Sequence, residues 1–181
     1  MLVHLAIAST LFVFCFAVIY GAICDVLTYT IPNRVSYGLV LLFCVYAALV
    51  WYRTPYFPHM GFYIEPIILN VIYALTVFIF FVVFWKLGWV GGGDVKFVSA
   101  IALFMGLEDV LLFVILLSII ATLMLLVIKL LPIISPVFWN ERLPPFIKNM
   151  ILSADQRAIP YGLPAAVAAL IVMPDVFARN Y

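Results

Sequence analysis

The sequence predicts an all-α, polytopic membrane protein with about six transmembrane helices. Its composition and the spacing of its apolar runs carry this prediction. Of the 181 residues, 69% are hydrophobic and 9% are charged, whereas soluble domains are roughly 45–50% apolar and about 25% charged. We therefore expect lipid to be the solvent for most of the chain. The length predicts a single domain, residues 1–181, with no room for a separate soluble catalytic domain.

Six apolar runs, separated by polar residues, Gly or Pro, mark the expected spans. They are Leu2 to Cys24, Val35 to Trp51, Ile64 to Trp85, Val95 to Leu107, Val110 to Leu131, and Tyr161 to Met173. The first run lacks a basic leading region and a small-residue cleavage site, so we expect a retained span and not a signal peptide.

The fourth and sixth runs contain 13 residues each. At about 1.5 Å per residue, such a run is too short to cross a hydrocarbon core of about 30 Å. We therefore expect the segments that lead into them, Gly91 to Asp94 and Ile159 to Gly162, to complete the spans as irregular backbone. Such backbone survives at membrane depth only against protein or a wet cavity.

The distribution of basic residues predicts the orientation, because Lys and Arg accumulate in cytoplasmic segments. If the C-terminal end of the first span faces inward, seven basic residues lie inside and two, Arg53 and Arg179, lie outside. The seven are Arg34, Lys86, Lys96, Lys129, Arg142, Lys148 and Arg157. We therefore expect a multi-pass membrane protein with both termini outside. The long inner segment 132–162 is predicted to be an interfacial helix or a lid.

Several classes of function are disfavoured by what the sequence lacks. The net charge is +1 and the basic residues are scattered, so no stripe suited to nucleic acid is present. The cysteines form no CxxC pair and have no neighbouring His, which argues against a zinc site or a disulfide framework. His4 and His59 are expected on the outer side, which argues against a Ser-His-Asp or metal mechanism. No cofactor or metal is expected.

Two aspartates are the candidate catalytic residues. Asp25 ends the first span and Asp94 opens the fourth, and the two complete crossings between them place both on one face of the membrane. Carboxylates at the edge of a bilayer are costly and are rarely kept without a partner or a role. Two carboxyl groups held close together in a partly desolvated site share one proton. One then deprotonates a water for attack on a peptide carbonyl, while the other hydrogen-bonds the carbonyl oxygen.

Structural roles are open for each of these residues. Asp94 follows three glycines and precedes an apolar run, which also fits a helix-capping aspartate. For Asp25 the alternative is a topology or solubility residue, since an acid at a helix C-terminus meets the negative end of the macrodipole. Gly91 and Gly93 suit a loop that admits an extended substrate, because glycine permits positive φ, or they form a plain connector.

The residues that flank the aspartates have simpler interpretations. Pro32 ends extended structure, and Asn33 is expected to cap the second span. Lys96 either favours ionisation of a nearby carboxylate or extends its ammonium to the inner surface, and we favour the second role.

Together these motifs resemble the prepilin peptidase family. The resemblance rests on Asp25 followed by Ile31-Pro32-Asn33, then Gly91-Gly92-Gly93-Asp94-Val95-Lys96, then Pro160-Tyr161-Gly162. It implies a GxGD-type aspartyl protease fold. It also implies an enzyme that cleaves N-terminal leaders from type IV pilin-like precursors at the cytoplasmic membrane face. Asp25 and Asp94 match the catalytic pair. The remaining motif residues, which would shape the loops and the substrate site, are Gly91, Gly93, Lys96, Pro32, Asn33, Pro160, Tyr161 and Gly162.

The chain is similar to the short form of that family. The long form carries a cytoplasmic insertion with paired CxxC motifs and also N-methylates its product, and this sequence has neither the insertion nor the motifs. The resemblance is therefore to peptidases of Flp-type tight-adherence pili or of archaeal preflagellins, and we favour the bacterial type. The implied partners are a pilin-like precursor and the lipid bilayer, and the oligomeric state is left open.

Three other functions compete with this interpretation. Presenilin and signal-peptide-peptidase proteins also use GxGD, but they have more spans, a Tyr-Asp motif and a late Pro-Ala-Leu, whereas here Cys24 precedes Asp25. A small proton-coupled transporter would use the two acids as a relay, although no inverted repeat is visible. A noncatalytic subunit of a pilus assembly would keep precursor processing intact when either carboxylate is removed.

Overall fold

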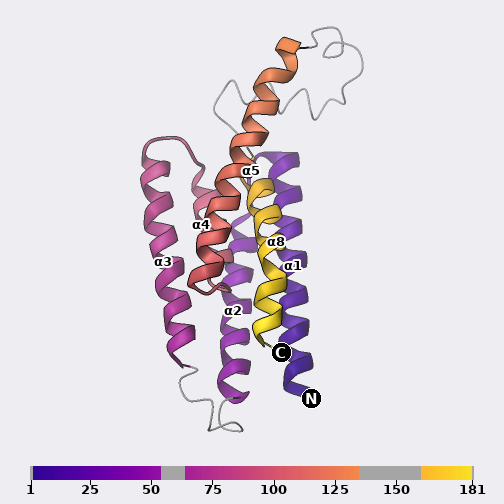
Figure 1. The fold of residues 1–181 in the computed structure, drawn as a ribbon, viewed down its shortest axis with the longest axis vertical. Coiled ribbons are helices and arrows are strands. Elements are labelled where there is room, and N and C mark those ends of the chain that lie inside the picture. Colours follow the sequence, from indigo (N-terminus) through magenta and orange to yellow (C-terminus); the bar gives the residue numbers. More distant parts are fainter. Residues whose placement is uncertain (1, 54–63, 135–159, 181) are drawn as a thin grey trace.

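The computed structural model describes residues 2–53, 64–134 and 160–180. Within these ranges it contains six helices and no strand (Figure 1). They are α1 (Leu2–Thr28), α2 (Asn33–Arg53), α3 (Ile64–Lys86), α4 (Gly92–Ala102), α5 (Leu107–Ile134) and α8 (Gly162–Asn180). Four of them, α1, α2, α3 and α5, are long and apolar enough to cross a membrane. The predicted all-α, polytopic fold class is confirmed.

Successive helices run up and down the bundle (Figure 1). The turn from α1 to α2, the turn from α3 to α4 and the start of α8 lie at one end, and both chain termini lie at the other. We call the first of these the aspartate end, because it holds Asp25 near the end of α1 and Asp94 near the start of α4. The two acids therefore lie at the same end of the bundle, as the parity of crossings predicts.

The shortest helix, α4, is the most enclosed. Its 11 residues span about 16 Å, and all residues from Asp94 to Ala102 except Lys96 are buried. It packs mainly against α2 and α3, whereas α8 packs mainly against α1 and α5. Large apolar side chains on the outer faces of the long helices, such as Phe16, Ile79 and Ile115, are exposed. This pattern is expected of helices that face lipid on one side and protein on the other.

Several helix boundaries differ from the predicted apolar runs. α1 continues past Cys24 to Thr28, so Asp25 lies inside its last turn and does not end the helix. The predicted run Val95 to Leu107 is interrupted after Ala102, and α5 begins at Leu107. At this break Asp109 Oδ2 accepts a hydrogen bond from the Gly106 N–H at 3.3 Å, which satisfies a free donor at the helix start.

The later boundaries also shift. α5 continues through Pro132 to Ile134, and α8 continues through Pro174 to Asn180. Hydrophobic runs mark where burial or lipid contact begins, whereas a helix extends further wherever its terminal backbone groups find partners. The predicted lid or interfacial helix falls mostly on 135–159, which lies outside the described residues, as does His59.

The Phe97 side chain of α4 packs against α1 at Gly21. A Cβ atom on Gly21 of α1 would lie 2.6 Å from Cε2 of Phe97, a fully buried residue of α4. Asp25 follows Gly21 by one helical turn, and Phe97 follows Asp94 by nearly one turn. The absence of a side chain at Gly21 thus leaves room for the Phe97 ring of the other aspartate-bearing helix.

The substitution Gly21→Ala is expected to destabilise the fold by about 1–3 kcal/mol, because the added methyl overpacks the contact with the fully buried Phe97 side chain. The matched control is Gly38→Ala on α2, where an added Cβ meets nothing within 4 Å. Thermal unfolding of the purified proteins in detergent measures both effects. Equal midpoints for the two variants would contradict the proposed role of Gly21.

Candidate active site

Asp25 lies in the last turn of α1 with 3% of its surface exposed. Beyond it, Tyr29 adopts φ of 54° and donates its N–H to the Asp25 carbonyl oxygen at 2.8 Å, which ends the helix. The Asp25 side chain accepts a 2.6 Å hydrogen bond from the backbone N–H of Gly162 to Oδ2. Gly162 begins α8, so the carboxyl group lies at the positive end of that helix. A negative charge on Asp25 is thereby stabilised.

The contact between Asp25 and Gly162 leaves no room for a side chain on Gly162. An added Cβ would lie 2.8 Å from Asp25 Oδ2 and 2.9 Å from Asp25 Cβ. Pro160, which precedes it, is buried. From the sequence, Gly162 was a motif residue without an assigned contact; in the structure its amide holds one catalytic candidate.

Tyr161 connects the same segment to the second aspartate. It lies in the turn before α8 and is half-buried. Its hydroxyl lies near enough to the Asp94 carboxylate to interact with it electrostatically. The segment Pro160-Tyr161-Gly162 therefore contacts Asp25 through its glycine and lies within electrostatic range of Asp94 at its tyrosine.

Asp94 occupies the third position of α4, with 9% of its surface exposed. Its Oδ2 accepts a hydrogen bond from the N–H of Gly91, the N-cap residue, at 3.1 Å. The capping interaction considered for Asp94 is present, but it is made from inside the first turn, in the manner of the acidic residue of a capping box. An added Cβ on Gly91 would lie 2.8 Å from that Oδ2, so a glycine is needed there.

The prediction that Gly91 to Asp94 is irregular backbone was wrong for most of the segment. Gly92 and Gly93 are the first two residues of α4, and Gly91 has an ordinary extended conformation with φ of −73°. The carboxylate of Asp94 satisfies a free N–H at the helix start, so the helix begins earlier than the apolar run. The positive φ expected in this region occurs instead at Gly88, at 73°, two residues after the end of α3.

The turn between α1 and α2 packs against the start of α4. A Cβ on Gly93 would lie 3.5 Å from the carbonyl oxygen of Ile31. Pro32 directly precedes α2, and its carbonyl oxygen accepts the Val35 N–H at 2.9 Å. This packing joins the Ile31-Pro32-Asn33 motif to the glycine-aspartate motif.

Asn33 and Lys96 add a polar link between these two motifs. The Lys96 Nζ donates to the side-chain Oδ1 of Asn33 at 3.2 Å. Asn33 is the first residue of α2, so its side chain serves this link to α4 in place of the predicted helix cap. Lys96 is exposed, in agreement with the expected extension of its ammonium toward the membrane surface.

The substitution Asn33→Ala is expected to lower the rate of substrate cleavage by about two- to tenfold, because it removes one hydrogen bond that ties α2 to the start of α4. Initial rates with a purified precursor measure the effect. Thr76→Ala, which removes a hydrogen bond made within α3 to Ile72, serves as the control and is expected to keep the wild-type rate. A wild-type rate for Asn33→Ala would show that the link does not position Asp94.

The two carboxyl groups lie close enough to interact electrostatically. Each uses Oδ2 to accept a backbone N–H, from Gly162 or from Gly91. Within the part of the chain that the structure describes, no group hydrogen-bonds to either Oδ1, and no cluster of His, Cys, Asp or Glu suits a metal ion. Two buried acids that repel when both are ionised can share one proton and act on a water.

Asp109 shows how much of the geometry at Asp94 is plain helix capping. The spacing Gly106-x-x-Asp109 repeats Gly91-x-x-Asp94, with the same backbone-to-carboxyl bond at the start of α5. Asp109 is also buried, at 4% exposure. The difference is position. Asp109 lies in the first turn of α5, which starts at the opposite end of the bundle (Figure 1), whereas Asp94 lies within electrostatic range of Asp25.

Sequence reasoning missed the contact between Gly21 of α1 and the Phe97 side chain of α4. A signal was present, because Gly21 precedes Asp25 by four residues and so lies on the same helix face.

Comparison with known proteins gives one match. A model of the type IV leader peptidase family matches residues 12–126, a segment that includes both Asp25 and Asp94. No curated protein and no solved structure matches the chain. The match covers more than half of the sequence, and the resemblance inferred from the motifs is confirmed. This membrane protein therefore belongs to the type IV leader peptidase family.

Proposed function

We propose that the protein is an aspartic-type endopeptidase that removes the N-terminal leader from Flp-type, pilin-like precursors. The observation that carries this proposal is the pairing of Asp25 and Asp94, two buried carboxyl groups within electrostatic range at one end of the bundle. Membership of a leader peptidase family supports the reaction class. The paired acids support the choice of mechanism.

In the proposed mechanism the two acids hold one proton between them. The ionised carboxylate removes a proton from water as the water oxygen attacks the scissile carbonyl carbon, and the protonated acid hydrogen-bonds the carbonyl oxygen. When the C–N bond breaks, the leaving amine takes a proton from the acid pair. The backbone N–H groups of Gly162 and Gly91 hold the two carboxyl groups in position during the reaction.

We place the site at the cytoplasmic face of the inner membrane. Four basic residues of the described chain belong to the aspartate end by their helix positions: Arg34, Lys86, Lys96 and Lys129. An excess of Lys and Arg is typical of cytoplasmic segments. Both termini would then face outward.

The unbroken first helix supports the short form of the family. α1 runs from Leu2 to Thr28 and contains Asp25, so no insertion separates the first span from the first aspartate. We therefore propose leader cleavage without methyl transfer, with an Flp-type precursor as the partner.

Reconstitution tests this proposal directly. The purified protein in liposomes is incubated with a purified Flp-type precursor, and the products are identified by mass spectrometry. We expect two products, the leader and a mature chain that begins just before its apolar helix. If the precursor stays intact although the protein is correctly inserted, the proposal is overturned. A proton flux across the same liposomes that requires Asp25 and Asp94 would favour the transporter alternative.

A further inference from the structure

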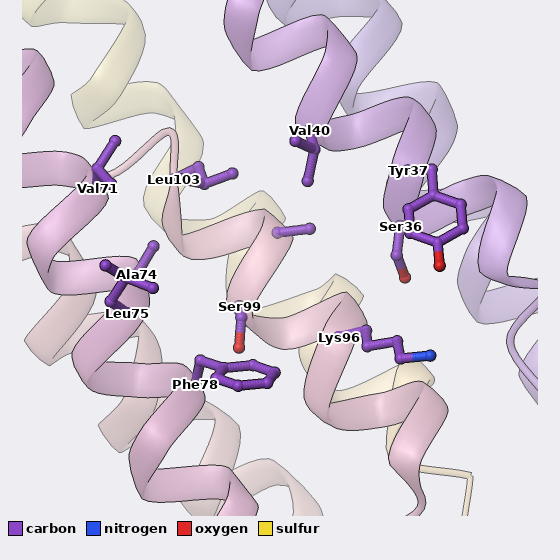
Figure 2. Close-up of a pocket in the computed structure, with 11 residues that line it drawn as sticks. Ser36, Tyr37, Val40, Val71, Ala74, Leu75, Phe78, Lys96, Ser99 and Leu103 are labelled. Atoms are coloured by element: carbon purple, nitrogen blue, oxygen red, sulfur yellow. The ribbon is translucent and has the colours of Figure 1, made fainter.

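A groove runs beside α4, between α2 and α3 (Figure 2). Both α2 and α3 pack against α4, which forms the floor, and the cavity volume is about 240 Å³. The residues that line it are Ser36, Tyr37, Val40, Val71, Ala74, Leu75, Phe78, Lys96, Ser99, Ala100 and Leu103. Among them Tyr37 and Leu75 are more than half exposed, so the groove opens to the lipid around the bundle.

The chemistry of the groove changes along its length. Ser36 and Tyr37 in the first turn of α2 and Lys96 in the first turns of α4 place two hydroxyls and an ammonium at the aspartate end (Figure 2). Apart from the Ser99 hydroxyl, the rest of the lining is apolar. A polar, cationic head above an apolar channel matches an amphiphile that enters from the bilayer.

The charge of Lys96 indicates the sign of the head group. Its ammonium donates a hydrogen bond to the neutral Asn33 side chain at 3.2 Å. Among residues 2–53, 64–134 and 160–180, no carboxylate forms an ion pair with it. Basic pockets between transmembrane helices at the membrane surface are typical sites for anionic head groups. An uncompensated cation at this depth is therefore complementary to an anionic phospholipid.

We propose that this groove binds one anionic phospholipid, with its phosphate at Lys96, Ser36 and Tyr37 and one acyl chain along α4 between α2 and α3. The inference does not depend on the peptidase reaction. The lipid would fill the space between two helices that pack on α4 from either side. It would also neutralise a cation two residues from Asp94.

Native mass spectrometry of the detergent-purified protein tests the proposal, with equimolar phosphatidylglycerol and phosphatidylcholine of identical chains. We expect wild type to retain one phosphatidylglycerol in preference to phosphatidylcholine. Lys96→Gln should lower that preference about fivefold, and Lys96→Arg should retain it. Lys129→Gln, which removes an exposed lysine of α5 outside the groove, should match wild type. Equal retention of both lipids, or equal preference in wild type and Lys96→Gln, would overturn the proposal.

Two further arms separate the lipid from other occupants. Ala74→Phe should reduce retention of the lipid by filling the apolar part of the groove, whereas unchanged retention would refute the placement of the chain. Free glycerol phosphate should not displace the lipid. Displacement would show that the head group alone accounts for binding, and it would refute the placement of the acyl chain in the groove. A synthetic precursor peptide with its apolar helix should leave the lipid bound. One-for-one displacement would assign the groove to the precursor and overturn the proposal.

Discussion

Replacing Asp94 with Asn is expected to lower the rate of leader removal by at least about 10²–10⁴-fold, the contribution typical of a general acid or base. The amide oxygen of Asn can still accept the hydrogen bond that the Gly91 N–H makes at 3.1 Å, so the start of α4 is retained. What Asn cannot do is ionise or share a proton with Asp25. Asp25→Asn should have the same effect, because its amide oxygen can likewise accept the Gly162 N–H.

Asp109→Asn is the matched control for this prediction. It makes the same change in a buried aspartate with the same capping bond, but at the opposite end of the bundle, so processing should stay near the wild-type rate. Precursor mobility on a gel, beside membrane fractions that confirm insertion, measures all the variants. Full processing by Asp25→Asn or Asp94→Asn would refute the paired-acid mechanism.

The double variant Asp25→Asn with Asp94→Asn provides a further check on the pairing. Residues that act as one catalytic unit are strongly non-additive, so the double variant should be about as slow as either single one. If the rate reduction of the double variant instead equals the product of the two single reductions, the acids contribute independently. That outcome would leave both residues important but would contradict a shared proton.

The location of both aspartates on the same side of the membrane could be predicted from the sequence. This prediction depends only on counting the apolar runs between them. An even number of complete crossings between Asp25 and Asp94 returns the chain to the same face whichever way it is inserted. Hydrophobicity also located all six helices of the described chain, because lipid selects apolar residues for the long spans and the protein core selects them for the enclosed α4. The class of fold followed from these two properties.

The contacts that hold the aspartates in place could not be predicted in this way. Gly162 and Asp25 are 137 positions apart, and neither periodicity nor composition pairs two residues at that separation. The helix limits shifted for a related reason. Asp94 and Asp109 satisfy free backbone N–H groups at helix starts, so the helices begin where capping partners occur and not where hydrophobic runs begin.

The glycine motif shows the same limit at a single position. Three consecutive glycines favour a flexible loop by composition, yet Gly92 and Gly93 are helical. The need for glycine at position 91 comes from the space that the Asp94 carboxylate occupies, with 2.8 Å between its Oδ2 and an added Cβ. A steric requirement set by a neighbouring side chain leaves no trace in a propensity scale.

Gly162→Ala is expected to lower the cleavage rate by about 10²-fold while the protein still inserts and folds. The added Cβ would lie 2.8 Å from Asp25 Oδ2 and 3.1 Å from its Cγ, distances that real Cβ contacts do not tolerate, so the carboxyl group must move. A displacement of about 1 Å in a catalytic group is enough to cost about 10²-fold in rate. The motion also lengthens the hydrogen bond from the Gly162 N–H, which in the wild type measures 2.6 Å.

Gly92→Ala separates this effect from a general intolerance of alanine near the site. Gly92 lies two residues from Asp94, but an added Cβ there meets its nearest neighbour, Trp85 Nε1, at 3.4 Å, so the alanine fits and the rate should stay within about threefold of wild type. Initial rates at saturating precursor, with thermal unfolding midpoints for both variants, distinguish a displaced carboxyl group from a misfolded protein. If Gly162→Ala cleaves as fast as Gly92→Ala, the amide of Gly162 does not position Asp25, and the role inferred for the Pro160-Tyr161-Gly162 segment is wrong.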